Sequence, residues 1–355
     1  MAVGSNGVLR SLQERVRSAV AAGTPLVIRA GGTKNFYGNA TGTKCDVLDP
    51  RVYRGVKDYE PTELVITACS GTALAEVEAT LAQHNQMLAF EPPHFGAATL
   101  GGAIASGLAG PRRMAAGSIR DFVLGTTLLD GRANVLTFGG NVMKNVAGYD
   151  VSRALGGSLG TLGLILEVSL KVMPRPAMEQ TLRFELPEAD AIRCTNEWAG
   201  QPWPISATAW CDGRLSVRLS GAAAGVRAAQ AKLGGNVVTD AEPFWIALRE
   251  QTHGFFNGTE NTTLWRLSVP PTAMPLDLGA TLLEWRGAQR WIWSSNSTEV
   301  RAKIQAVGGH ATAFRHHRGD VFHPLAPALS RIHLRLKKEF DPAGIFNPGR
   351  MYPNF

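Results

Sequence analysis

The sequence predicts an α+β fold of two or three domains, and three observations lead to that prediction. In a chain of 355 residues, hydrophobic residues make up 45% and charged residues 18%, which suits sizeable buried cores. Segments with strand and helix periodicity alternate along the first half with short connections. Glycine and tryptophan are unevenly placed, since 24 of 39 glycines precede Pro176 and all eight tryptophans lie between Trp198 and Trp293.

The elements of the first half follow from the spacing of apolar residues. Those from Leu9 to Val20 recur at helical spacing, and Gly23 ends that helix. Downstream, the same reasoning predicts a helix at 74–85 and strands at 26–28, 47–48, 64–68, 87–90, 122–129, 134–138 and 164–172. A turn at Asp130-Gly131 makes the strands on either side of it a hairpin.

The stretch from Pro92 to Gly110 is small, apolar and glycine-dense. In it Thr99 precedes the Gly101-Gly102 pair, and we expect a helix to start at Ala103. A glycine pair lets backbone N–H groups approach a ligand, and a helix N-terminus adds its dipole to the same place. The pattern favours an anion site, with a tight turn in a small-residue core as the alternative.

Two further glycine turns lie next to predicted strands. One runs from Arg29 to Asn35 and carries a cation on each side of its glycine pair; the other runs from Gly156 to Gly163. A simple strand-to-loop turn is the alternative for the first of them. The chain contains neither G-x-G-x-x-G nor a Gly-Lys dipeptide, so a nucleotide would be held by a scheme other than the Rossmann or P-loop motif.

Charge and cysteine content exclude several classes of protein. The net charge of +7 comes from scattered residues, which gives little support to nucleic-acid binding and suits an anionic ligand, an acidic partner or the inner membrane surface equally. The four cysteines show no C-x-x-C spacing, so we expect buried thiols and neither a zinc site nor an iron–sulfur cluster. Without an apolar run long enough to span a bilayer or a signal-peptide pattern, we expect a cytoplasmic location.

Taken together, the glycine turns resemble the FAD-binding domain of the vanillyl-alcohol oxidase and p-cresol methylhydroxylase type. The matching segments are Arg29-Ala30-Gly31-Gly32-Thr33, Thr99-Leu100-Gly101-Gly102 and Gly160-Thr161-Leu162-Gly163. The segment from Lys144 to Asp150 narrows the resemblance to the D-lactate and glycolate branch. The segment from Phe340 to Arg350 resembles the end of that branch, where an Asn-Pro-Gly segment returns to the flavin. The resemblance implies a two-lobed FAD-binding domain at 1–176, a reduced ferredoxin-like cap at 177–325 and a C-terminal segment at 326–355 that returns to the FAD domain.

The glycine turns and the resemblance nominate a set of FAD-binding residues. They are Arg29, Ala30, Gly31, Gly32, Thr33, Lys34, Pro92, Thr99, Leu100, Gly101, Gly102, Gly107, Gly110, Lys144, Asn145, Gly160, Thr161, Gly163, Ile165 and Asn347. Lys144 and Arg350 are the candidate contacts for a substrate anion. No residue stands out as a base, so the catalytic residues stay unassigned.

Two departures from the family pattern bear on the cofactor and on metal binding. Relatives often attach the flavin to a histidine of the first loop, where this chain has Thr33-Lys34-Asn35, so we expect non-covalent FAD. Catalytic relatives carry His-x-Gly-Asp-Gly-Asn-x-His. Here the segment from His317 to His323 places the second histidine one position early and lacks the Gly-Asn pair. We therefore expect an exposed polar loop and no metal.

By resemblance, the chain is a subunit of an FAD-dependent oxidoreductase complex that oxidises glycolate, a 2-hydroxy acid, to glyoxylate. The implied partners are a larger flavin-binding catalytic subunit and an iron–sulfur subunit; peripheral association with the inner membrane is also compatible. Because the cap is short and its histidines are out of register, we expect no oxidation of glycolate by this chain alone. The rivals are a self-sufficient FAD oxidase of another hydroxy acid or a sugar lactone, and an assembly subunit whose flavin is structural or absent.

The middle region, from Met178 to His323, has the periodicity of a ferredoxin-like βαββαβ unit. Its expected strands and helices lie at 178–185, 188–198, 204–211, 213–220 and 222–232. A second similar unit is expected to begin near Leu264. The tryptophans of this region are core residues, part of a partner surface or a lid over the flavin, and we favour the first two interpretations equally.

Overall fold

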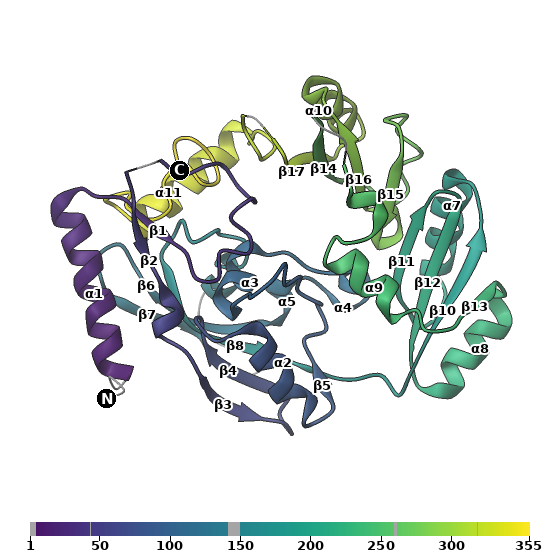
Figure 1. Ribbon diagram of the computed structural model, residues 1–355, viewed down its shortest axis with the longest axis horizontal. Helices are drawn as coiled ribbons and strands as arrows, with labels where there is room; N and C mark the ends of the chain where they lie inside the picture. The colour runs from purple at the N-terminus through teal and green to yellow at the C-terminus, as the bar shows by residue number, and fades with distance from the viewer. Residues whose placement is uncertain (1–4, 43, 141–149, 259–260, 318) are drawn as a thin grey trace.

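The computed structural model describes residues 5–42, 44–140, 150–258, 261–317 and 319–355 (Figure 1). The elements of the first half are α1 (Ser5–Ala22), β1 (Leu26–Ile28), β2 (Asp46–Leu48), η1 (Pro50–Val52), β3 (Val56–Glu60), β4 (Val65–Cys69), α2 (Leu74–Ala82), β5 (Gln86–Met87), α3 (Leu100–Ser106), α4 (Arg113–Ala116), α5 (Ile119–Phe122), β6 (Val123–Leu129), β7 (Val135–Gly139), α6 (Val151–Ala154), β8 (Leu164–Lys171) and β9 (Met173–Pro174).

The first half forms two lobes. In the smaller lobe, β1 pairs in parallel with β2, and α1 buries Leu12, Val16 and Ala19 in a core that also contains Phe346 from the end of the chain. The larger lobe contains an antiparallel five-stranded sheet in the order β3-β4-β8-β6-β7. Helices α2 and α3 pack on this sheet through a second apolar core. The spacing of their apolar residues gives each helix an apolar face toward that core.

Two expectations for the first half are wrong in detail. The strand expected at 87–90 ends at Met87, because the backbone N–H of Glu91 bonds to the carbonyl of Leu88 and turns the chain before the two prolines. The helix expected to start at Ala103 starts at Leu100, with the Thr99 hydroxyl accepting a hydrogen bond from the N–H of Gly102. The glycine pair therefore lies inside the first helical turn.

The second half forms an eight-stranded sheet in the order β13-β10-β12-β11-β15-β16-β14-β17. Its elements are β10 (Met178–Glu185), α7 (Glu188–Ala199), β11 (Ile205–Cys211), β12 (Arg214–Gly221), α8 (Ala223–Leu233), β13 (Asn236–Val238), α9 (Glu242–Arg249), η2 (Gly254–Phe256), β14 (Thr263–Ser268), β15 (Thr281–Glu284), η3 (Trp285–Gly287), β16 (Gln289–Ser294), α10 (Ser297–Ala306) and β17 (His310–Arg315). After it, α11 (Pro327–Phe340) returns to the first half (Figure 1).

The eight strands are two ferredoxin-like units joined at β11 and β15. The first unit runs β10-α7-β11-β12-α8-β13, with the strand order 4-1-3-2 typical of that fold. The second unit mirrors this order in β14 to β17, but residues 269–280, all described, form turns where the first unit has a helix. The second unit therefore lacks the helical periodicity that, in the first unit, separates the first two strands.

The tryptophans of the second half are core residues. All eight are buried or half-buried, and six donate their indole N–H to a partner in the chain. Trp245, for example, donates to the hydroxyl of Thr181 at 2.9 Å. The structure thus favours the core interpretation over a tryptophan-rich partner surface.

Candidate cofactor-binding site

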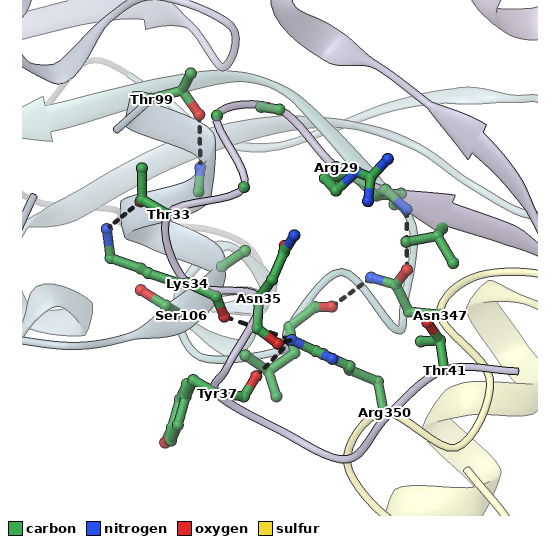
Figure 2. A pocket seen from close by; sticks show the side chains of 18 of the residues that line it. Arg29, Thr33, Lys34, Asn35, Tyr37, Thr41, Thr99, Ser106, Asn347 and Arg350 are labelled. Carbon is green, nitrogen blue, oxygen red and sulfur yellow. Dashed lines mark hydrogen bonds between the residues drawn. The ribbon is translucent and has the colours of Figure 1, made fainter. Parts of the chain in front are cut away.

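A cavity of about 340 Å³ opens between the loop after β1, the first turn of α3 and the C-terminal segment (Figure 2). Arg29 to Asn35 line one side, Thr99 and Gly102 another, and Asn347 a third. These segments are far apart in sequence, and the cavity exists because the smaller lobe, α3 and the chain end meet there.

The loop after β1 supplies free hydrogen-bond donors. Among the described residues, the backbone N–H groups from Ala30 to Lys34 form no hydrogen bond, whereas the N–H of Arg29 still pairs with Leu48 of β2. Gly32 takes a φ of +69°, and a Cβ at Gly31 would lie only 2.1 Å from the carbonyl oxygen of Ala97. Successive free N–H groups on such a turn form a concave anion site.

The N-terminus of α3 contributes space and few donors, contrary to the expectation from the sequence. The N–H groups of Leu100 and Gly101 bond to the carbonyls of Thr72 and Ser70, and that of Gly102 bonds to the Thr99 hydroxyl. Gly102 is nonetheless exposed on the cavity wall. The anion-binding potential therefore lies in the first loop, and the helix leaves room for the ligand.

Lys34 places an amine beside this loop. Its Nζ donates to the carbonyl of His94 at 3.2 Å and to the hydroxyl of Thr33 at 3.4 Å. Burial lowers the pKa of Lys34 to about 8, and Glu250 opposes that shift. The Glu250 carboxylate also accepts hydrogen bonds from the N–H groups of His94 and Phe95, so the second half of the chain holds in place the segment whose carbonyl Lys34 contacts.

The C-terminal segment reaches the cavity through Asn347 and Arg350. The Asn347 side chain accepts a hydrogen bond from the N–H of Ile28 and donates to the carbonyl of Leu159. The Asp341 carboxylate shapes the turn after α11 by accepting hydrogen bonds from two backbone N–H groups, those of Ile345 and Phe346. Asn347 thereby joins three segments of the cavity wall.

Arg350 is not a free anion contact, which corrects the sequence-based hypothesis. Its Nη1 and Nη2 atoms donate to backbone carbonyls, at 2.8 Å to Asn39, 2.8 Å to Asn35 and 2.7 Å to Tyr37. Burial lowers the pKa of this guanidinium. Arg350 instead fixes the loop that follows the first glycine turn, because a buried guanidinium is stable only when its donors are satisfied.

The structure brings some of the nominated residues together and separates others. Those that line the cavity are Arg29, Ala30, Gly31, Gly32, Thr33, Lys34, Thr99, Gly102 and Asn347. Those that lie elsewhere are Pro92, Leu100, Gly101, Gly107, Gly110, Gly160, Thr161, Gly163 and Ile165. Lys144 and Asn145 lie outside the described residues.

Several nominated residues outside the cavity wall have a packing role that explains their glycine or small side chain. A Cβ at Gly101 would lie 2.5 Å from the Cβ of Ser70, and Gly107 caps α3 with a φ of 65°. Thr161 is fully buried and its carbonyl accepts a hydrogen bond from the ammonium of Lys337. The nominated motifs thus contain both residues that line the cavity and residues whose small size allows close packing elsewhere.

Sequence reasoning missed nine residues that line the cavity. They are Val27, Ile28, Asn35, Tyr37, Ala40, Thr41, Ala105, Ser106 and Leu159. Ser106 was detectable in principle, since it lies four residues after Gly102 and so on the same face of α3. Val27 and Ile28 belong to β1, and Ala105 to α3. The rest lie on loops, where spacing alone does not indicate which side chains face a cavity.

Glu284, at the end of β15, is a buried carboxyl that the sequence did not single out. It accepts hydrogen bonds from Gln289 at 2.8 Å and Trp291 at 2.6 Å, and burial raises its pKa to about 7. With Arg266 it lines a void of about 20 Å³, enough for about one water molecule. This void is too small for a 2-hydroxy acid, so Glu284 does not stand at an open substrate site.

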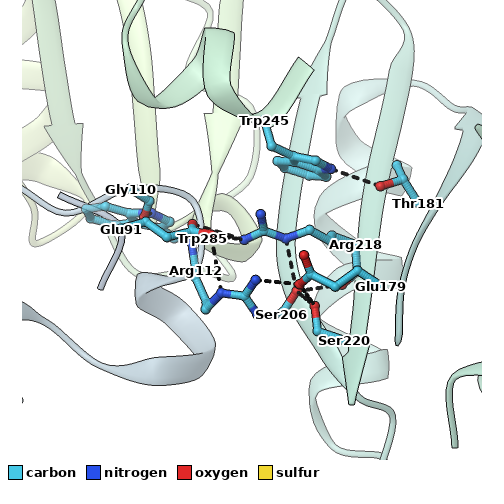
Figure 3. A network of polar contacts seen from close by, with 10 residues as sticks. All are labelled: Glu91, Gly110, Arg112, Glu179, Thr181, Ser206, Arg218, Ser220, Trp245 and Trp285. Atoms are coloured by element: carbon cyan, nitrogen blue, oxygen red, sulfur yellow. Dashed lines mark hydrogen bonds and ion pairs between the residues drawn. The ribbon is translucent and has the colours of Figure 1, made fainter. Parts of the chain in front are cut away.

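A buried ionic network joins the two halves of the chain (Figure 3). Glu91, after β5, accepts hydrogen bonds from Arg218 of β12 at 2.8 and 3.0 Å and from the N–H and Nε of Arg112. Arg112 also pairs with Glu179 of β10. Both arginine side chains are 8% exposed. The network fixes where the second half sits relative to the first.

Comparisons with known proteins agree with this geometry. A family model described as an FAD binding domain matches residues 9–139. This part of the chain is therefore an FAD-binding domain, and FAD is its cofactor. The glycolate oxidase subunit GlcE of Escherichia coli (strain K12) is 48% identical over 347 residues, which cover 97% of both chains.

Other relatives match mainly one part of the chain. The D-lactate dehydrogenase of Archaeoglobus fulgidus is 32% identical over 51% of this chain and 41% of that protein. The glycolate oxidase subunit GlcD of Bacillus subtilis (strain 168) is 29% identical over 48% of this chain and 36% of that protein.

The fold recurs in a solved structure of an alkyldihydroxyacetonephosphate synthase. That structure matches with a TM-score of 0.69 over 95% of this chain and 75% of the other, at 16% identity. The predicted α+β fold with an FAD-binding domain is thereby confirmed. None of the described helices has the length and hydropathy needed to cross a membrane.

Proposed function

Because the chain belongs to the family of the glycolate oxidase subunit GlcE, we propose that it is the FAD-binding subunit of a complex that oxidises glycolate to glyoxylate. FAD accepts two electrons at once and can release them singly, which is the chemistry that links a hydroxy acid to one-electron carriers. The observation that carries the proposal is the cavity with free N–H donors inside an FAD-binding domain.

The residues around the cavity fit a non-covalently bound FAD. The N–H groups from Ala30 to Lys34 are free to bind the diphosphate, and the exposed Gly102 leaves space for it. The Lys34 amine adds a positive charge. We further propose that residues 1–176 are the FAD domain, 177–325 the cap and 326–355 the segment that completes the FAD site through Asn347.

We expect the affinity for FAD to fall as the pH rises above about 8, the pKa to which burial lowers the Lys34 amine. Below this pKa the amine is charged and attracts the diphosphate. Bound diphosphate favours the charged form and raises the pKa, so affinity falls by up to about tenfold per pH unit between the free and bound pKa values and then levels off. Fluorescence titration of the apoprotein with FAD from pH 6.5 to 10 measures this.

Two variants test whether the pH dependence of FAD affinity comes from Lys34 or from another charge on the same loop. Lys34→Arg keeps its charge over the whole pH range and should flatten the curve. Arg29→Met, on the same loop, is the matched control and should bind FAD less tightly yet keep the decline above pH 8. An affinity of the wild-type chain that stays constant from pH 7 to 9.5 would contradict the contact between Lys34 and the diphosphate.

We propose that this chain exchanges electrons with partner subunits and does not oxidise glycolate alone. A 2-hydroxy acid needs a cation for its carboxylate and a base for its hydroxyl proton. Arg350 is committed to backbone carbonyls, and Glu284 faces a void the size of one water molecule. The partners are a larger flavin-binding subunit and an iron–sulfur subunit, and peripheral membrane association belongs to the assembled complex.

The four cysteines support an external iron–sulfur partner. They are Cys45, Cys69, Cys194 and Cys211, and each is a free thiol. Burial raises the pKa of three of these thiols, those of Cys69, Cys194 and Cys211. Among the described residues, no three His, Cys, Asp or Glu side chains are grouped so that they could hold a metal ion, and we propose that the cluster belongs to another chain.

Anaerobic mixing with glycolate tests the proposal. Acid precipitation of the purified chain should first release FAD into the supernatant, which establishes occupancy and non-covalent binding. The FAD-loaded chain, mixed anaerobically with excess glycolate, should keep its flavin absorbance. Bleaching should appear only when the partner subunits are added, because they supply the substrate site.

Each other outcome points to a rival. Rapid bleaching of the isolated chain would make it a self-sufficient oxidase, and bleaching by a sugar lactone alone would identify that class of substrate. A colourless chain that still joins the complex would make it an assembly subunit. Flavin that stays with the acid precipitate would show covalent attachment.

A further inference from the structure

Helix α11 carries an unusual set of exposed apolar side chains. Among the described residues, ten large hydrophobic side chains are exposed, and three of these lie on this one helix: Leu329 at 50%, Ile332 at 58% and Leu334 at 41%. Leu329 and Ile332 lie on consecutive turns in line with Leu336, which packs on the core. They form an apolar ridge that runs from the core onto the open surface.

A row of cations runs along α11 roughly a third of a turn around the helix from this ridge. Arg331, Arg335 and Lys338 are exposed and spaced four and three residues apart, so they line up along the helix. Within the part of the chain that the structure describes, none of the three forms an ion pair or a hydrogen bond. An apolar ridge beside unpaired cations is complementary to an apolar groove with carboxylates along one edge.

The inner face of α11 is firmly anchored, so the outer face is pre-organised. The buried ammonium of Lys337 donates to Asp341 at 2.8 Å and to the carbonyls of Thr161 and Phe346. Phe340 packs edge-on against Phe138 of β7. A rigid helix loses little conformational freedom when a partner binds.

We propose that the outer face of α11 is the surface by which this chain docks onto another protein subunit of its complex, through an acid-edged apolar groove on that subunit. The proposal rests on the proposed function, because it assumes the complex. Its position suits that role: seven residues after α11 ends, the same segment reaches Asn347 on the cofactor cavity. A lipid surface is less well matched, because the ridge has no aromatic side chain and the cations lie to one side of it.

Co-expression of the chain with the GlcD-like and iron–sulfur subunits, followed by size-exclusion chromatography, tests this surface. Ile332→Glu should weaken co-elution at least tenfold, and so should Arg331→Glu combined with Arg335→Glu. Met274→Glu changes a residue of the cap that is also 58% exposed and is the matched apolar control. Arg227→Glu with Lys232→Glu, on the exposed face of α8, is the charge control. All variants should retain FAD content and thermal stability.

The outcomes distinguish this inference from the proposed function. Ile332→Glu that assembles like the wild-type chain would overturn the docking surface alone, whereas a wild-type chain that never joins the partners would overturn both. The wild-type chain can also be sedimented with vesicles of anionic phospholipid. If Ile332→Glu lost this sedimentation but assembled normally, the face would bind a membrane, and the docking proposal would be overturned. Loss of assembly confined to the α11 variants would support it.

Discussion

Gly102→Val should abolish FAD binding and leave the fold intact. Gly102 is exposed on the cavity wall, and a Cβ there would meet only the Thr99 hydroxyl, at 3.2 Å. A valine side chain would therefore project into the space proposed for the diphosphate. We expect a loss of affinity of at least roughly 100-fold, about 2.7 kcal/mol, measured by titration of the apoprotein with FAD.

Gly101→Val should destabilise the fold, unlike Gly102→Val, although the two glycines are adjacent. A Cβ at Gly101 would lie 2.5 Å from the Cβ and 3.0 Å from the carbonyl oxygen of Ser70, so α3 would have to move away from β4. Overpacking of this kind costs about 1–3 kcal/mol. Denaturant unfolding of the apoproteins should show the loss for Gly101→Val and not for Gly102→Val.

A control variant shows whether replacing a helical glycine by valine is harmful in itself, or only where the side chain would enter the cavity. Gly225, on the first turns of α8, has open space around its Cβ position, so Gly225→Val should alter neither FAD content nor stability by much. If Gly102→Val bound FAD normally, the cavity would not be the diphosphate site. If both adjacent variants unfolded alike, the glycine pair would be only a packed turn.

The sequence was most informative where periodicity and local chemistry agree. The helix from Leu9 onward, the buried strand at 26–28 and the first ferredoxin-like unit were predicted close to their observed bounds. Each has a regular apolar spacing that matches the face it buries. The first glycine loop was also predicted correctly as a turn at the end of a strand, because Gly31-Gly32 has few alternatives there.

The remainder depended on contacts between distant segments. The N–H of Gly101 bonds to the carbonyl of Ser70, and Arg350 donates to carbonyls more than 300 residues away in sequence. These hydrogen-bond donors are therefore already paired with distant carbonyls in the folded chain. No local sequence pattern predicts that pairing. The same reason explains Glu284, whose raised pKa results from burial in a sheet that two separate units build together.

Glu91→Ala should destabilise the protein strongly, by about 3–5 kcal/mol, because it removes one partner from a buried ionic network. Burial alone would raise the pKa of Glu91, but Arg218 and Arg112 outweigh it and hold this pKa below the usual range, so the carboxylate is charged. Without it, the Arg218 side chain keeps, among the described residues, the Ser206 hydroxyl as its one acceptor. Denaturant unfolding followed by tryptophan fluorescence measures the loss, since the tryptophans lie in the cap.

The large loss expected for Glu91→Ala results from leaving a buried, desolvated guanidinium without its partner. An exposed ion pair provides the comparison. Glu185 and Arg214 form a pair at 3.9 Å with side chains 71% and 60% exposed, so Glu185→Ala should change the free energy of unfolding by less than about 1 kcal/mol. Replacing Glu91 and Arg218 together by leucine and methionine should recover much of the stability, because no unpaired guanidinium then remains from that pair. Equal, small effects of Glu91→Ala and Glu185→Ala would show that water reaches the network and that it does not fix the cap against the FAD domain.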